Sequence, residues 1–404
     1  MLQYEISVMK VDFLPADRGE VIAAMEPLGI AEGSRHRGPI LDLALELAQR
    51  STGLRRSLPA SLLTSLADLV RSMNCYYSNL IEGHDTHPVD IERALKSDYS
   101  HDAKQRELQL EAKAHIEVQA WIDDGGLRGG QACTVAGILE IHRRFCARLP
   151  EELLWVEQRP VIGGQVRRDD VRVGQHVAIS PGSVPRFLQR FENFYLSLGR
   201  TQSIVASAAA HHRLLWMHPF LDGNGRVARL MSHAMMLETL ETGAVWSVAR
   251  GLARNAQAYK TLLAGCDQTR RNDLDGRGTL SEEALVAFTQ FFLKTCLDQV
   301  NFMEGLMQPD RLRTRMLLWA EEEHRLGKLP PKAGTILEAL LYRGELPRGD
   351  ADTVAGLGER QARRIVAALI ERGVLTSTGP RAPLRLAFPA ALASRWMPGL
   401  FPDQ

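Results

Sequence analysis

Apolar residues recur every three to four positions along most of this 404-residue chain. That spacing places them on one face of an α-helix, so it predicts a mainly helical protein. The pattern is clearest in residues 40–49, 59–81, 103–122, 134–148, 183–198, 203–217, 226–240 and 282–307. Thr134 and Ser203 are suitable N-caps for two of these helices. A chain of this length is expected to hold two or three domains and to bury a large core.

Residues 163–181 depart from the helical pattern. Val171 and Val173 come before Gly174, and Val177 and Ile179 come after it, so apolar residues recur at alternate positions. Alternation about a glycine predicts a short β-hairpin. This hairpin is either a structural loop or, if its edge is exposed, a strand that can pair with an extended peptide.

The pattern changes again after residues 327–331, GKLPP, which mark a domain boundary. The elements predicted beyond it are helices at 336–341 and 361–370, a short helix between them, and strands at 374–376 and 384–386. Three helices followed by a hairpin are the order of a winged-helix domain. We therefore expect such a domain at the C-terminus.

Winged helices bind DNA or mediate protein contacts, and the charge of this region favours neither strongly. From residue 331 to 404 there are ten Lys/Arg against seven Asp/Glu. That excess is too small to demonstrate DNA binding. The net charge of the whole chain is +1, which gives no overall attraction to nucleic acid or to a membrane surface. DNA stays an open partner of this domain, ranked behind a role in protein contacts or packing.

The cysteines and the start of the chain indicate the compartment. The five cysteines are scattered and form neither a CxxC pair nor a zinc-binding spacing, so we expect reduced thiols in a cytosolic protein. The first residues, MLQYEISVMKVDF, lack the apolar run of a signal peptide. No stretch reaches the ~18 apolar residues of a transmembrane helix. We expect a cytoplasmic protein with no membrane partner.

Residues 218–229, HPFLDGNGRVAR, gather side chains that can bind a phosphate between two predicted helices. Gly223 and Gly225 let a ligand approach the backbone closely on either side of Asn224. The amides of this turn lie at a helix N-terminus, which favours an anion. Arg226 and Arg229 are three residues apart, so they project from one helix face and can bond phosphate oxygens.

Two further side chains of the same stretch add chemistry to this loop. Asp222 can hold a magnesium ion that bridges phosphate oxygens. His218 titrates near neutrality and can accept a proton from a hydroxyl group. A histidine before a proline, a GNG turn and two arginines on a helix are each common as structural features. Their combination within twelve residues indicates a site that grips a polyphosphate and moves part of it.

A second informative stretch is residues 78–83, SNLIEG. Ser78 and Glu82 are four residues apart, so they share a helix face. Gly83 fits the C-terminal cap of that helix. Glu82 then faces the negative end of the helix dipole and needs a cation nearby. The plainer alternative is that Glu82 is simply exposed, which is the commoner fate of a helical glutamate.

The stretch 218–229 resembles the core motif of the Fic (Fic/Doc) family, His-x-Phe-x-Asp/Glu-Gly-Asn-Gly-Arg-x-x-Arg, at every defined position. The resemblance implies a mainly α fold: a Fic-type helical core with a β-hairpin flap. It implies AMPylation, the transfer of AMP from ATP to a Ser, Thr or Tyr hydroxyl of a protein. The related Doc kinases carry lysine in place of Gly225, so the glycine favours AMP transfer over phosphorylation.

The resemblance also implies a role for each matched residue. His218 would be the base and Asp222 the magnesium ligand. The nucleotide would be held by Gly223, Asn224, Gly225, Arg226 and Arg229. The hairpin resembles the family's flap, which clamps the backbone of the target; its candidate residues are Val173, Gly174, Val177 and Ile179.

Residues 78–83 resemble the family's inhibitory motif, [Ser/Thr]-x-x-x-Glu-[Gly/Asn], at all three defined positions. The resemblance implies that Glu82 pairs with Arg229 and keeps ATP from binding in a posture suited to in-line attack. Since the motif precedes the core motif in the same chain, the inhibition would be intramolecular. In some relatives the same glutamate supports removal of AMP from the modified protein.

These patterns together predict three regions. They are an N-terminal helical region with the inhibitory helix (1–110), a Fic core (111–328) and a winged-helix domain (329–404). The predicted function is a protein adenylyltransferase that uses ATP and Mg²⁺ and acts on a hydroxyl-bearing protein or on itself. The alternative is a winged-helix DNA-binding transcriptional regulator whose core only senses nucleotide. The presence of His218 argues against that alternative, because a sensor needs no base. A homodimer remains open.

Overall fold

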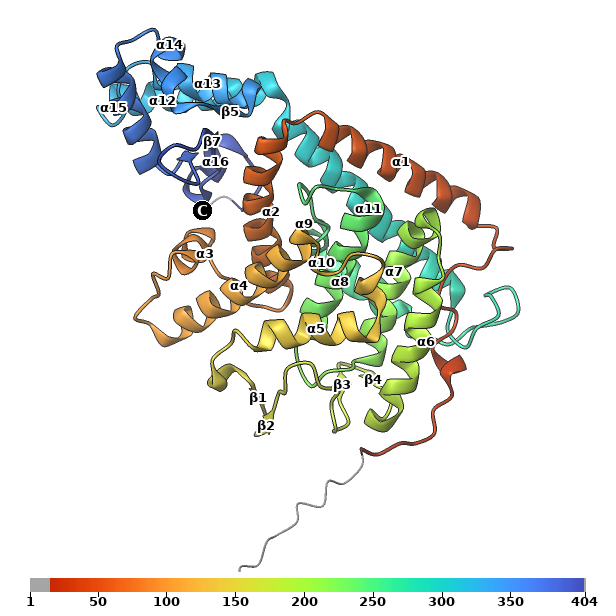
Figure 1. Cartoon of the computed structure of the whole chain (residues 1–404). Helices are drawn as coiled ribbons and strands as arrows, with labels where there is room; N and C mark the ends of the chain where they lie inside the picture. Colours follow the sequence, from red (N-terminus) through yellow and green to blue (C-terminus); the bar gives the residue numbers. More distant parts are fainter. Residues whose placement is uncertain (1–14, 403–404) are drawn as a thin grey trace, which may run out of the picture.

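The computed structural model describes residues 15–402 and is mainly helical (Figure 1). Each stretch with clear apolar periodicity is a helix. These helices are α1 (Arg37–Arg56), α2 (Ala60–Ile81), α4 (Ala103–Trp121), α5 (Val135–Cys146), α6 (Val184–Leu196), α7 (Arg200–Met217), α8 (Asn224–Leu240) and α11 (Glu282–Met307). All except α1 agree with the prediction to within three residues at either end. The predicted N-cap Thr134 accepts a hydrogen bond from the backbone N–H of Gly137.

Four α-helices among residues 15–330 were not predicted. They are α3 (Pro88–Leu95), α9 (Ala249–Arg254), α10 (Ala256–Gly265) and α12 (Pro309–Arg325). Three of them are too short to display a clear period. The fourth, α12, carries charged residues around most of its circumference, which conceals its narrow apolar stripe.

Helices α7 and α8 pack extensively against each other (Figure 1). Small buried side chains lie along both, among them Ser207 and Ala210 on α7 and Ala228 and Ser232 on α8. Small residues let two helix backbones approach closely. Only residues 218–223 connect the two helices, so the predicted phosphate-binding motif spans a tight turn at their shared end and the first turns of α8.

The predicted hairpin is present. Strands β3 (Arg172–Val173) and β4 (His176–Val177) pair antiparallel, with Val173 opposite His176. Gly174 occupies the turn with φ +59°. A second hairpin, β1 (Trp155–Val156) with β2 (Arg159–Pro160), was not predicted. Its two-residue strands are too short for alternation to show, and its turn lacks the usual glycine.

The C-terminal elements follow the predicted order, with an added strand after the first helix and an added short helix at the end. They are α13 (Ala333–Arg343), β5 (Glu345–Leu346), α14 (Ala351–Ala355), α15 (Glu359–Glu371), β6 (Leu375–Thr376), β7 (Leu384–Leu386) and α16 (Ala393–Trp396). The three strands form an antiparallel sheet in the order β5-β7-β6. This unit packs on α2, where the Tyr77 hydroxyl donates a hydrogen bond to the Leu400 carbonyl at 3.1 Å.

The apolar interior consists of two clusters. One joins α1, α2 and α11 to the C-terminal elements, and the other lies among α4, α5, α6, α7 and α8. All five cysteines are buried free thiols, as predicted. Within residues 15–402 no helix is both long and apolar enough to cross a membrane.

Candidate active site

The connection between α7 and α8 begins with His218. This residue is the C-cap of α7 and adopts the left-handed conformation, with φ 48° and ψ 62°. A residue other than glycine rarely adopts this conformation, so the surrounding contacts must hold it there. Gly223, with φ +82°, ends the turn, and α8 starts at Asn224.

The turn is closed by the Asn224 side chain. Asn224 Oδ1 accepts a hydrogen bond from the Phe220 N–H at 3.0 Å, and Asn224 Nδ2 donates to the Phe220 carbonyl at 2.9 Å. The side chain that the sequence assigned to nucleotide binding is therefore bonded to the loop itself. The structure leaves the backbone of this turn, at the N-terminus of α8, as the part that can meet an anion.

We expect Asn224→Ala to lower the free energy of unfolding by about 2–4 kcal/mol. The substitution leaves the buried N–H and C=O of Phe220 without partners, and each such group costs about 1–3 kcal/mol. Asn272→Ala is a matched control, because Asn272 accepts one hydrogen bond from Leu274 in an exposed loop. Chemical denaturation of both variants measures the difference. Equal losses would show that the Asn224 side chain does not hold the turn.

Phe220 fixes the turn to the core. It is fully buried, and its ring stacks on His142 with centroids 3.8 Å apart and an interplanar angle of 15°. His142 Nδ1 accepts a hydrogen bond from the Gly164 N–H at 2.9 Å. Burial lowers the pKa of His142 to about 4, so this ring is neutral at physiological pH. It therefore serves as an uncharged platform for the turn.

The Arg229 guanidinium is buried and bound by Ser78 and Glu82, the residues of the predicted inhibitory motif. Arg229 Nε donates to Ser78 Oγ at 2.8 Å, and Nη2 donates to the Ser78 carbonyl at 3.2 Å. Arg229 Nη2 also pairs with Glu82 Oε1. The contact that the resemblance implied between Glu82 and Arg229 is thus present in the structure.

Glu82 lies against the predicted anion-binding turn. It is the C-cap of α2, and Gly83 follows with φ +86°. A Cβ added to Gly225 would collide with Glu82 Oε1, so the carboxylate lies directly beside the first turn of α8. Burial alone would raise the pKa of Glu82, but the Arg229 guanidinium lowers it below its ordinary value. An anion therefore already occupies the place where the sequence predicts a phosphate.

Arg226, the other predicted phosphate ligand, is held by two carboxylates. It pairs with Glu111 of α4 and, at 3.2 Å, with Asp222. Glu111 also contacts His84, with Oε2 2.9 Å from Nδ1. That hydrogen bond raises the pKa of His84, the second residue after Glu82. A continuous polar chain therefore connects the segment after the inhibitory helix to the arginine of the core motif.

His218 is suited to act as a base. Burial, and then the nearby Arg167 guanidinium, lower the pKa of its imidazole to about 4. The ring is therefore neutral at pH 7 and able to accept a proton. A free histidine, which titrates close to 6.5, is already mostly neutral at pH 7, and the surroundings extend that neutrality into the acidic range.

Asp222 fits the part of a magnesium ligand. Its side chain is about half exposed beside the turn, and Mg²⁺ usually takes one or two carboxylates together with waters and substrate phosphates. Among residues 15–402 no group of three or more His, Cys, Asp or Glu side chains is arranged to hold a metal, so an ion at Asp222 would need further ligands from water or from a bound nucleotide.

The hairpin exposes two of the apolar side chains that the sequence predicted for a target-binding flap. Val173 and Val177 are half exposed, on either side of the Gly174 turn. Ile179, which we grouped with them, lies beyond β4, and its side chain is buried in the core among α4 to α8. The exposed edge of the flap therefore consists of β3 and β4 only. His176 Nε2 lies 2.8 Å from the Trp216 carbonyl and attaches this edge to α7.

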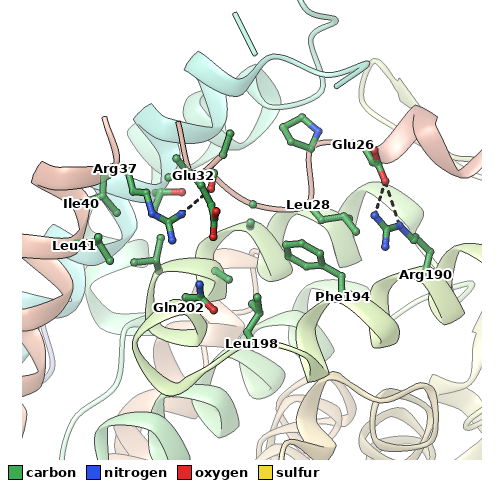
Figure 2. A pocket seen from close by; sticks show the side chains of 18 residues that line it. Glu26, Leu28, Glu32, Arg37, Ile40, Leu41, Arg190, Phe194, Leu198 and Gln202 are labelled. Atoms are coloured by element: carbon green, nitrogen blue, oxygen red, sulfur yellow. Dashed lines mark hydrogen bonds and ion pairs between the residues drawn. The ribbon is translucent and has the colours of Figure 1, made fainter. Parts of the chain in front are cut away.

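A cavity of about 350 Å³ lies elsewhere, where residues 26–32 cross α1, α6 and α7 (Figure 2). Its walls include Leu28, Phe194 and Leu198, and Glu26 and Arg190 form an ion pair at its edge at 2.6 Å. None of the motif residues lines it. Its walls reach along α7 only as far as Ala209, which is about 14 Å from His218 at 1.5 Å per residue. This cavity is therefore separate from the candidate site.

Sequence reasoning missed Glu111, His142 and Arg167. Each belongs to a different segment, and each meets the motif only in the folded chain. The one local signal was weak: Glu111 falls on the buried face of a predicted helix, where an unpaired carboxylate would be costly.

The chain matches known proteins over this region. The sequence profile of the Fic/DOC family matches residues 132–236. Protein adenylyltransferase Fic of Drosophila erecta is 35% identical over 106 residues, and that of Drosophila yakuba is 36% identical over 106 residues. Each match spans 26% of this chain and 20% of the relative's length, so this chain covers only a fifth of each relative.

Two solved structures share the fold over longer stretches. A Fic family protein from Desulfovibrio desulfuricans has a TM-score of 0.53 and 17% identity, with 89% of this chain and 98% of that chain covered. A Fic domain containing signaling protein from Bacteroides thetaiotaomicron has a TM-score of 0.51 and 18% identity, with 65% and 95% covered. At these identities the likeness concerns the fold alone. The chain therefore carries a Fic/DOC-family domain at residues 132–236, within a helical fold that it shares with Fic-family proteins.

Proposed function

We propose that this chain is a protein adenylyltransferase, which transfers AMP from ATP to a Ser, Thr or Tyr hydroxyl of a target protein or of itself. The observation that carries the proposal is the juxtaposition of a neutral His218 with an anion-binding turn whose cradle already holds the Glu82 carboxylate. The name of the Drosophila relatives, protein adenylyltransferase, supports the same activity.

In the proposed reaction the target hydroxyl attacks the α-phosphorus of ATP. A bond forms between the hydroxyl oxygen and that phosphorus, and the bond from the phosphorus to the bridging oxygen of the β-phosphate breaks. His218 accepts the hydroxyl proton, and pyrophosphate leaves. The exposed edge of β3 and β4 would hold the target segment by backbone pairing.

The remaining motif residues bind and orient the nucleotide in this proposal. Backbone N–H groups near Gly223 and Gly225 donate hydrogen bonds to phosphate oxygens at the N-terminus of α8. Arg226 and Arg229 neutralise the distal phosphates. Asp222 would hold Mg²⁺, which reduces the negative charge of the phosphates when it is bound.

Glu82 is the proposed brake. While Arg229 is bonded to Ser78 and Glu82, its guanidinium cannot also orient a terminal phosphate, and the carboxylate repels that phosphate. ATP would then be held in a geometry unsuited to in-line attack. The same carboxylate would assist removal of AMP from a modified hydroxyl, as a second activity of this site.

The three regions proposed from the sequence, 1–110, 111–328 and 329–404, would then supply the brake, the chemistry and an appended contact module. The C-terminal module supports contacts within the chain, since its strands pack on α2. A gel-shift assay with the promoter of the protein's own gene decides whether this module also binds DNA.

We expect radioactive phosphorus to be incorporated into protein only when it is in the α-phosphate of ATP. The full chain, with Mg²⁺ and cell extract, should gain the mass of one AMP unit per modified hydroxyl and incorporate α-³²P. Incorporation of γ-³²P instead would show phosphorylation and would overturn AMP transfer. Binding of ATP without any incorporation, in the wild type and in Glu82→Gly, would favour the nucleotide-sensing regulator.

A further inference from the structure

The side chain of Arg167 lies between the flap and the end of α7, and it is only 3% exposed. Its guanidinium hydrogen bonds go to backbone carbonyls: Nε donates to His218 at 2.7 Å and Nη1 to Asp169 at 2.8 Å. Nη2 donates to Ile179, with a longer contact of 3.5 Å to Met217. Such a fork of five N–H groups can bond several carbonyls at once, which an ammonium group cannot match in geometry.

These carbonyls belong to two separate parts of the site. Met217 and His218 form the end of α7, while Asp169 and Ile179 lie just before β3 and just after β4. The backbone N–H of Arg167 also donates to the Pro219 carbonyl, at 2.9 Å. One residue therefore joins both stems of the flap to the backbone on either side of the His218 Cα.

The electrostatics agree with this geometry. The last carbonyls of a helix carry partial negative charge, so the end of α7 is a favourable place for a cation. Burial lowers the pKa of Arg167 to about 10, which leaves it charged at neutral pH. The charged groups around it are Asp170, Arg18, Glu20 and Asp169. Its own charge in turn helps to keep His218 unprotonated.

We propose that Arg167 is the positioning residue of the site: it fixes the left-handed backbone of His218 and sets the distance between His218 and the flap. The proposal deepens the proposed AMP transfer, on which its kinetic consequence rests. A target segment paired with the flap edge would thereby present its hydroxyl at a fixed distance from the imidazole. A shift of about 1 Å in such an arrangement costs on the order of 10²-fold in rate.

The test compares Arg167→Lys with Arg213→Lys in the full chain. Arg213 is also a fully buried arginine of the same fold, and it donates to the Pro27 carbonyl at 3.0 and 2.8 Å without contacting the motif turn. Both changes keep the charge and lose the fork. We expect Arg167→Lys to lower kcat for AMP transfer on the order of 10²-fold with unchanged ATP affinity. Arg213→Lys should leave kcat unchanged below its melting temperature.

A second readout does not depend on AMP transfer. In an NMR titration of the His218 imidazole, Arg167→Met should raise the midpoint above that of the wild type, because one of the causes that lower the pKa is removed, and Arg167→Lys should keep it low. The other groups that act on His218, His176 and Asp222, are the same in both variants. An unchanged titration in Arg167→Met, or equal kcat losses in the two lysine variants, would overturn the positioning role. If the chain transfers no AMP at all, the titration still tests whether the Arg167 charge lies close enough to act on His218.

Discussion

Replacing His218 with alanine should reduce AMP transfer by about 10²- to 10⁴-fold, the usual contribution of a positioned base. The substitution removes the group that accepts the hydroxyl proton, whereas the turn that binds phosphate stays closed by Asn224 and Phe220. ATP affinity should therefore remain close to that of the wild type. Incorporation of α-³²P measures the first quantity, and calorimetry measures the second.

The pH dependence of the same reaction supplies a further check on His218. Because the pKa of its imidazole is lowered to about 4, the base form persists through neutral and mildly acidic pH. Activity should decline only as the pH falls toward 4, when His218 becomes protonated. His101→Ala, which alters an exposed histidine outside the site, is the matched control. A rate that His218→Ala leaves unchanged would remove His218 from the mechanism.

Replacing Glu82 with glycine should raise AMP transfer by about 5- to 150-fold, the range that 1–3 kcal/mol of coupling produces. The change removes the anion beside Gly225 and frees the Arg229 guanidinium, which then can bind a phosphate. Initial rates of self-labelling with α-³²P-ATP measure the gain. Stability should fall in the absence of ATP, because Arg229 stays buried without its carboxylate partner.

Glu241→Gly is the matched control for the glutamate change. Glu241 is also a helix C-cap residue, at the end of α8, and pairs with Arg55 and Arg200 on an exposed surface. Breaking those pairs should leave the labelling rate unchanged. Equal rates for wild type and Glu82→Gly would remove the brake from the mechanism.

Acid should not release this brake in the neutral range. The folded-state pKa of Glu82 is below its ordinary value of 4.5, so the carboxylate stays charged and paired with Arg229 at every pH above that value. Its contribution is lost only as the pH falls through the lowered pKa.

The sequence specified the helices well where the apolar stripe was long and clean, as in α2, α7 and α8. It failed for α12, whose stripe is narrow among charged residues, and for the two-residue strands of β1 and β2. Local patterns report the free energy gained by burying one face of an element. An element that buries little apolar surface, or that is only two residues long, therefore shows no clear pattern in the sequence.

The two linear motifs also predicted one contact between distant parts of the chain. The contact between Glu82 and Arg229 could be predicted from the sequence, because each residue belongs to a short motif and the family resemblance implies that the two residues pair. Other contacts of the same arginines could not be stated in this way. Glu111 meets Arg226 across 115 positions of the chain, and no spacing within α4 indicates it.

The sequence alone therefore determined the helices with a long, clean apolar stripe, and it pointed to the turn and the histidine of the candidate site. These properties depend on residues within a few positions of one another. Only the tertiary structure decided that Arg167 joins the flap to His218, that Glu111 holds Arg226, and that the C-terminal strands pack on α2. Buried charges and polar groups must find partners wherever the chain brings them, and sequence distance places no limit on where those partners lie.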